Sequence, residues 1–138
     1  MKKHLLVAVL AAVSLGLGVS NAPINAQAKT LSTLPKALRG NWKKHLGWGH
    51  YKQNTWEKAY TYVGHKHSFW DGMTQSDTYP STVRYVISKG HGLYKVHVKT
   101  TMGGTSYHVV TMKRTKHTLR VIQNGYGMTY TSHHKAIE

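Results

Sequence analysis

The sequence contains no cysteine and only four acidic residues among its 138. The absence of cysteine excludes a disulfide framework, thiol catalysis and cysteine-ligated zinc. The four carboxylates belong to Glu57, Asp71, Asp77 and Glu138, whereas lysines and arginines number 19. The resulting formal net charge of +15 bears on the partners of the protein rather than on its fold. An anionic partner is therefore expected.

Recognisable catalytic patterns are also scarce. A glycosidase needs two placed carboxylates, and Glu57, Asp71 and Asp77 form no recognisable pair. The chain has neither a Gly-x-Ser-x-Gly nucleophile motif nor a glycine-rich phosphate loop. Two histidines could serve as acid and base in a nuclease, but nothing selects a pair among the 11 histidines. We predict a protein that is not an enzyme and has no cofactor, with a histidine-based nuclease as the alternative.

The first 28 residues follow the order of a secretory signal. Lys2 and Lys3 precede the uncharged run Leu5–Val19, and a stretch with small residues ends at Ala28. The apolar run is shorter than the roughly 20 residues that a membrane-spanning helix needs. We expect cleavage after Ala28, which would leave a secreted chain with no transmembrane segment.

The remainder of the chain predicts a mostly β domain. Runs of β-branched and aromatic residues alternate with turn residues such as Gly103-Gly104 and Asn124-Gly125. The predicted strands are Asn41–Leu46, Glu57–Val63, Ser68–Met73, Thr82–Lys89, Leu93–Lys99, Ser106–Met112, Thr118–Gln123 and Tyr126–Ser132. This spacing predicts an antiparallel meander of seven or eight short strands, closed into a barrel or sandwich to remove its edges. We place a helical signal peptide at 1–28, a linker with a short helical turn at 29–39, the β domain at 40–134 and a tail at 135–138.

Two resemblances concern the stretch Leu34–Trp42. Gly40-Asn41-Trp42, after a short helical turn, resembles the Gly-x-Trp start of the first strand in lipocalins and other calycins. This resemblance implies a small lipocalin-like barrel in which Gly40 and Trp42 close one end and a basic residue, Arg120, packs on the indole. The whole stretch also resembles the start of small, uncharacterised secreted proteins of lactic-acid bacteria. A barrel of this size can be filled by its own side chains.

The segment Leu46–Trp56 is rich in glycine and aromatic residues. We predict that it is a recognition loop, because glycine supplies flexibility while Trp48, Tyr51 and Trp56 offer rigid contact area with a polar handle. Such rings could bind sugars, lipid headgroups or apolar ligands. In the alternative interpretation Trp56 fills the core together with Phe69 and Trp70. Trp48, which lies between two glycines, is the ring that we most expect to be exposed.

Basic residues gather in local groups along the chain. The candidate binding residues among them are Lys43, Lys44, Lys113, Arg114 and Lys116. An exported protein meets the phosphate-bearing polymers of the cell envelope first, so we predict these polymers, and not nucleic acid, as the physiological partner. The alternative is a cation excess spread over the whole outer face of the sheet.

Two histidine pairs resemble partial metal sites. His65 and His67 would share one face of a strand, and His133 is followed directly by His134. Neither pair has a nearby carboxylate or cysteine to complete a metal shell, so we predict no metal site. Histidine titrates near pH ~6.5, and acidification would therefore strengthen attraction to anionic surfaces.

The sequence thus predicts a secreted, cationic, non-enzymatic binding protein, held at the bacterial cell surface by attraction to anionic envelope polymers. The alternatives are a lipocalin-like carrier of a small apolar or sugar ligand and a cationic antimicrobial protein. An open apolar cavity would favour the carrier, whereas one continuous basic face would favour polyanion binding.

Overall fold

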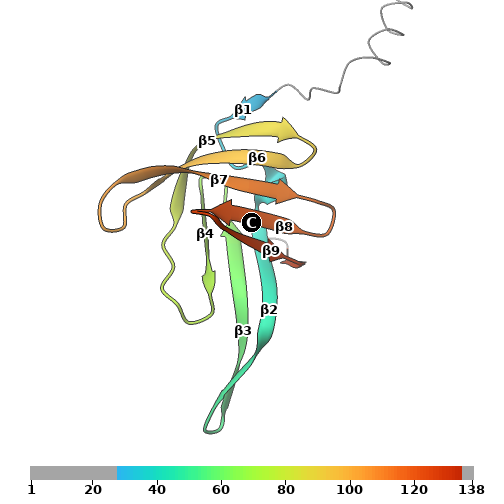
Figure 1. Ribbon diagram of the computed structural model, residues 1–138, viewed down its shortest axis with the longest axis vertical. Helices are drawn as coiled ribbons and strands as arrows, with labels where there is room; N and C mark the ends of the chain where they lie inside the picture. Colours follow the sequence, from blue (N-terminus) through green and yellow to red (C-terminus); the bar gives the residue numbers. More distant parts are fainter. Residues whose placement is uncertain (1–27, 135–138) are drawn as a thin grey trace, which may run out of the picture.

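The computed structural model describes residues 28–134, which fold almost wholly into antiparallel β-structure (Figure 1). The predicted signal peptide, apart from Ala28, and the predicted tail at 135–138 lie outside the described residues. The strands are β1 (Lys29–Leu31), β2 (Gly40–Tyr51), β3 (Asn54–Gly64), β4 (Ser68–Met73), β5 (Ser81–Gly90), β6 (Leu93–Thr100), β7 (Ser106–Arg114), β8 (Leu119–Gln123), β9 (Tyr126–Tyr130) and β10 (Ser132–His134). A short 3-10 helix, η1 (Lys36–Leu38), lies between β1 and β2.

The ten strands form one sheet that curls into a nearly closed barrel. From β2 to β9, each strand pairs with the next one along the chain. Only Thr131 separates β9 from β10. β9 pairs with β8, whereas β10 pairs with β2 at the other edge of the sheet. The chain therefore crosses from one edge of the sheet to the other at Thr131. This crossing removes most of the exposed edge that an open meander would leave.

All eight strands predicted from the sequence are present, and β4 has the predicted bounds. The predicted number of seven or eight strands is wrong, because the described part of the chain contains ten. β10 extends the last predicted run, which is divided at Thr131 where the chain changes partner. β1 lies in the predicted linker and pairs with β5, off the main path of the sheet. Both additional strands, β1 and β10, pair with a strand that is distant in the sequence.

The barrel is filled at one end by its own side chains. Alternation directs Val96 and Val98 of β6 into this core, as the period of two predicts. Phe69 is buried here too, whereas Trp56 and Trp70 are only half-buried. The buried cluster consists of Leu34, Leu38, Trp42, Tyr62, Phe69, Val83, Val86, Val96, Val98, Val110, Met112, Leu119, Val121 and Tyr130.

The helix η1 closes this filled end. Leu34 and Leu38, on either side of Pro35, are fully buried. The Tyr62 hydroxyl donates a hydrogen bond to the Leu38 carbonyl oxygen at 2.8 Å. Gly64 is required beside them, because a Cβ at this position would collide with the Leu38 carbonyl oxygen. The closure therefore depends on one buried hydroxyl and one position without a side chain.

Tyr62→Phe should lower the free energy of unfolding by about 1–2 kcal/mol, because it leaves the buried Leu38 carbonyl without this donor. Urea denaturation followed by tryptophan fluorescence measures the loss. Tyr126→Phe is the matched control, since the Tyr126 side chain is 83% exposed and its hydroxyl can bond to water. Equal losses in the two variants would contradict this role of Tyr62.

Candidate functional site

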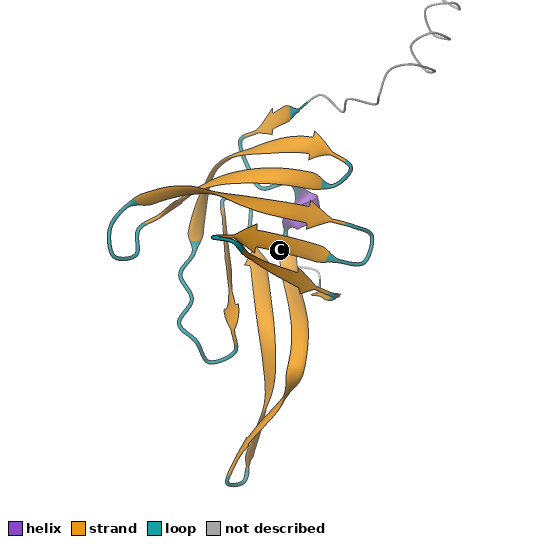
Figure 2. Ribbon diagram, viewed as in Figure 1, coloured by secondary structure: helices purple, strands orange, loops and turns teal. Residues whose placement is uncertain are grey.

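Four separate segments of the chain meet at the closed end of the barrel. They are η1 with Arg39, the β3–β4 turn, the β5–β6 turn and the β7–β8 turn. The Leu34 N–H donates to the Lys66 carbonyl oxygen at 2.9 Å. Lys113 Nζ donates to the His91 carbonyl oxygen at 2.6 Å. Figure 2 shows η1 beside the turns that join β5 to β6 and β7 to β8.

These four segments and the ends of β5 and β7 beside them are rich in cations, and we call the basic side chains there the basic end. The basic end consists of Lys36, Arg39, His65, Lys66, His67, Lys89, His91, Lys113, Arg114, Lys116 and His117. No acidic residue occurs within the segments themselves. The carboxylates of the described residues lie elsewhere, on β3 (Glu57), on β4 (Asp71) and in the loop after β4 (Asp77). This end therefore carries cations without carboxylates, while nine further lysines and arginines of residues 28–134 lie elsewhere in the fold.

The structure divides the predicted basic residues into two groups. Lys113, Arg114 and Lys116 belong to the basic end. Lys43 and Lys44 lie on β2, away from it. Lys43 Nζ also donates to the Glu57 carboxylate at 2.8 Å, so part of its charge is balanced within the chain.

The cation that covers Trp42 is Arg114, and the prediction of Arg120 for this role is wrong. The Arg114 guanidinium carbon lies 4.5 Å from the centre of the Trp42 ring. Its Nε donates to the carbonyl oxygen of Ala37 at 3.2 Å. Arg120 is exposed and donates to the Thr129 hydroxyl at 3.2 Å. The reason is alternation, because the neighbours of Arg120 in β8 are both buried and Arg120 must point outward.

The Trp42 ring is enclosed on other sides as well. Its side chain is 1% exposed, and the His133 ring centroid lies 4.3 Å from it. Gly40, two residues earlier, has a φ of 105°, which favours glycine. Gly40, Trp42 and Arg114 thus lie together where β2 begins, and Arg114 joins η1 to the barrel.

His65 and His67 lie in the β3–β4 turn, and their predicted place on a strand is wrong. Both side chains are exposed, so the argument that a strand directs them to one face does not apply. Within residues 28–134 no group of three or more histidines and carboxylates is placed to hold a metal ion. The two histidines instead belong to the basic end.

The segment Leu46–Trp56 is not a loop but the distal part of the β2–β3 hairpin, which projects from the barrel (Figure 1). The two strands remain paired as far as Tyr51 and Asn54. β10 pairs with β2 only up to Lys43, and β4 pairs with β3 only down to Tyr60. Beyond these points the hairpin is a two-stranded arm whose outer edges pair with no other described strand.

The glycines of the arm serve its packing rather than its flexibility. Gly47, with a φ of 134°, lies at a shift in the β2–β3 register. Gly49 lies under the Trp56 indole, where a Cβ would collide with the ring. Trp48 is 59% exposed and Tyr51 is 64% exposed, which confirms the expected exposure of Trp48. The arm therefore presents aromatic rings on a paired backbone.

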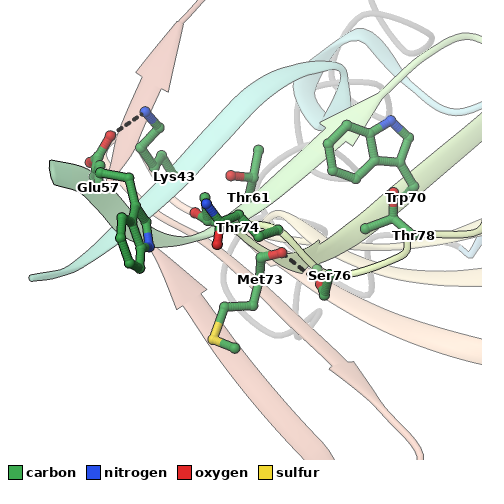
Figure 3. A pocket seen from close by; sticks show the side chains of 11 residues that line it. Lys43, Glu57, Thr61, Trp70, Met73, Thr74, Ser76 and Thr78 are labelled. Carbon is green, nitrogen blue, oxygen red and sulfur yellow. Dashed lines mark hydrogen bonds and ion pairs between the residues drawn. The ribbon is translucent and has the colours of Figure 1, made fainter. Parts of the chain in front are cut away.

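A groove of about 430 Å³ lies on the outer surface where the arm meets β4. Figure 3 shows the pair formed by Lys43 and Glu57 at one side of the groove and Trp70 at the other. Trp56 also lines it. Hydrogen bonds from Lys43 and His45 lower the pKa of Glu57 below its usual value. The groove thus combines indole rings with a neutralised ion pair.

The loop after β4 forms one wall of this groove. Thr74 continues the pairing with β3, because its N–H donates to the Ala59 carbonyl oxygen at 2.9 Å and its hydroxyl accepts from the Ala59 N–H at 3.0 Å. The Ser76 hydroxyl donates to the Met73 carbonyl oxygen at 2.6 Å. These bonds hold the wall against the barrel and leave the Thr61 side chain facing the groove.

The open end of the barrel holds Asp71, which alternation on β4 places on the same face as the buried Phe69. Gln123 Nε2 donates to the two Asp71 carboxylate oxygens at 2.8 and 3.1 Å. The Tyr130 hydroxyl lies 3.5 Å from one of them as a further donor. Burial raises the pKa of Asp71, and these two donors oppose the rise. Burial and the charge of Asp71 also raise the pKa of Tyr130, which keeps it a neutral donor.

This site was not predicted from the sequence, where Asp71 stood out only as a candidate for a glycosidase pair. The available signal was the alternation in Ser68–Met73, which places Asp71 and Phe69 on one face of a strand. Gln123 and Tyr130 carried no such signal, since they come to Asp71 only through the curvature of the barrel.

A scan against protein-family models, a search of curated proteins and a search of solved structures all find no match for this chain. Residues 28–134 include no helix that is long and apolar enough to span a membrane. The function must therefore be inferred from the charge and geometry of the chain itself.

Asp71→Asn should change the free energy of unfolding by less than about 1 kcal/mol at pH 7, because the amide keeps the shape of the carboxylate and an acceptor for Gln123. The substitution should also alter the pH dependence of the free energy of unfolding. The pKa of Asp71 is raised in the folded chain, so the folded state holds this proton more tightly than the unfolded state. Wild-type protein should therefore gain stability relative to the variant as the pH falls through the folded pKa toward the unfolded value of about 3.9.

Urea denaturation of both proteins at several pH values measures this difference. Asp77→Asn, in the exposed loop after β4, is the control and should keep the wild-type pH profile. A wild-type protein that lost stability relative to Asp71→Asn on acidification would have the opposite sign and would refute the raised pKa.

Proposed function

We propose that this protein is a secreted, non-enzymatic binding protein, held at the bacterial cell surface by attraction to anionic envelope polymers. The observation that carries the proposal is the basic end, where four chain segments bring together lysines, arginines and histidines without a carboxylate among them. Nine further lysines and arginines lie elsewhere in residues 28–134, and matched variants that remove charge at the two places distinguish this proposal from the alternative, a cation excess spread over the sheet.

The basic end has the properties that attract a repeating anion. Lys36, Lys66 and Lys116 are all exposed, and each comes from a different segment. Charges of one sign on one surface add their fields, which raises the local concentration of an oppositely charged polymer. Several weak contacts to one polymer also reinforce one another, because each further contact is intramolecular. A chain of phosphates is the simplest partner that satisfies both conditions.

The lipocalin-like character of the barrel is part of the proposal. It is supported by Gly40 and Trp42 at the start of β2, by the short helix η1 before them, and by the Arg114 guanidinium 4.5 Å from the Trp42 ring. In this arrangement the packed, closed end of the barrel is also the basic end. The charged turns then stand on a fixed base, which reduces the entropy lost when they bind.

The arm and the outer groove would add aromatic contact to the same polymers. Trp48 and Tyr51 are exposed on the arm, and Trp56 lies in the groove. Indole and phenol rings offer rigid apolar area with a polar edge, which suits the faces of sugar rings. Lys43 and Lys44 lie near the base of the arm and would contact the phosphates between such sugars.

Replacing Lys36, Lys66 and Lys116 together by Gln should weaken binding to poly(glycerol phosphate) at least about tenfold, because each exposed lysine near an anionic surface contributes roughly 1 kcal/mol. Affinity is measured by calorimetry at several salt concentrations, and the salt dependence should become shallower. The matched control replaces Arg84, Lys95 and Lys99 of β5 and β6 by Gln, which removes the same charge outside both the basic end and the arm. Equal losses in the two triple variants would indicate net charge alone and refute a localised site.

Affinity for the same polymer should rise as the pH falls from 7 to 5, because histidine side chains gain charge over roughly this range. Replacing His65, His67, His91 and His117 by Gln should reduce this rise, since these four belong to the basic end and the six other histidines of residues 28–134 remain. The comparison with the wild type cancels any titration of the polymer itself. An unchanged pH response in the variant would contradict a contribution of the basic end.

A further inference from the structure

The carboxylate inside the barrel has no cationic partner among the described residues. The ion pairs found there are those of Glu57 with Lys43 and His45. Asp71 is hydrogen-bonded instead to two neutral groups, the Gln123 amide and the Tyr130 hydroxyl. A chain with 19 lysines and arginines does not lack cations to place beside it. Burying a charge without a counter-charge is costly, so this arrangement calls for an explanation.

Two cavities adjoin this carboxylate at the open end of the barrel. One has a volume of about 300 Å³ and the other of about 700 Å³. Asp71, Gln123 and Tyr126 line both. Within the described part of the chain no lysine or arginine lines either cavity, and His108, in the larger one, is the single basic side chain. The space next to Asp71 is therefore open to a cation from outside the chain.

The walls of these cavities suit a cation that carries an apolar body. The smaller cavity is lined by Tyr60, Tyr130 and Met128, and the larger one by Tyr79. The Tyr107 ring, which also lines the larger cavity, already packs against the Arg84 guanidinium at 4.7 Å. The faces of tyrosine rings attract cations through their negative π-electron density. A carboxylate has about four acceptor positions. The donors from Gln123 and Tyr130 leave room for one more.

We propose that the open end of the barrel binds a small organic ammonium ion, with Asp71 as its counter-charge and tyrosine rings around its apolar body. Gln123 and Tyr130 are positioning residues, because they fix the carboxylate from β8 and β9. The volumes lie at or above the lower limit of about 300 Å³ for small-molecule pockets. The bound ammonium group supplies the positive charge that the chain itself leaves out.

The cations of the basic end do not prevent such binding. The strand β6, with 8 residues, spans roughly 26 Å from the basic end to the open end. Charges in solution are screened over about 8 Å at physiological salt. An ammonium ion at the open end is therefore largely shielded from the lysines at the other end, while Asp71 acts on it at close range.

The test uses three ligands with one body and three charges: 2-phenylethylamine, 2-phenylethanol and phenylacetate. They are titrated into the full domain at pH 7, with calorimetry for affinity and the NMR signal of the Gln123 side-chain amide as the local probe. The protonated amine should bind roughly tenfold or more tightly than the alcohol, because its ammonium group forms an ion pair with the Asp71 carboxylate that the alcohol cannot form. It should shift the Gln123 signal, and phenylacetate should bind least.

Asp71→Asn should reduce the affinity for the amine to that for the alcohol. Asp77→Asn, which removes the same charge from the exposed loop after β4, should leave the preference for the amine intact. Neither variant should weaken binding of poly(glycerol phosphate), so failure of this proposal and failure of the proposed surface function are distinguishable. The ligand series is measured on the wild type, so it tests the ammonium site even where a variant folds poorly.

Three outcomes would overturn the proposal. Equal affinity for the amine and the alcohol would indicate an apolar ligand site. Equal loss of amine binding in the Asp71 and Asp77 variants would indicate a general effect of net charge. Absence of a Gln123 shift at millimolar amine would show that the ligand does not enter the open end.

Discussion

The pairing of β10 with β2 is the constraint on which the rest of the structure depends. It joins the two edges of a meander, and in a closed meander every second turn lies at the same end of the barrel. The β3–β4, β5–β6 and β7–β8 turns therefore meet η1 at one end. The loops after β4, β6 and β8 gather at the other. Residues that are distant in the sequence become neighbours only because the sheet closes.

This division separates two kinds of chemistry. The closed end has a filled core below it and turns that carry cations without carboxylates, so its charge is fixed to a rigid base. The open end is lined by tyrosines and holds a carboxylate with neutral partners. Arg114 connects fold and charge, because it covers Trp42, bonds to η1 and belongs to the basic end at the same time. Its removal would affect stability and binding together, which makes exposed lysines the cleaner probes of binding.

The strands could be located from the sequence because their signals are local. Alternation of side chains and turns such as Asn124-Gly125 identify a strand without knowledge of its partner. The arm was misassigned because glycine has two uses: Gly49 accommodates the Trp56 ring, and the sequence alone suggests flexibility instead. Arg120 was misassigned for a different reason. Its place between the buried Leu119 and Val121 already directs it outward, but the resemblance to other barrels outweighed that pattern.

The sequence by itself determined the excess of positive charge, the absence of cysteine chemistry, the dominance of β-structure and the positions of eight strands. Tertiary structure decided which cations share a surface, which cation covers Trp42 and which polar groups surround Asp71. The physical reason is that composition and alternation are properties of short segments. The contacts of Arg114 with Ala37 and of Asp71 with Gln123 join residues that are 77 and 52 positions apart. Such neighbours are set by strand pairing and barrel closure, which no local pattern encodes.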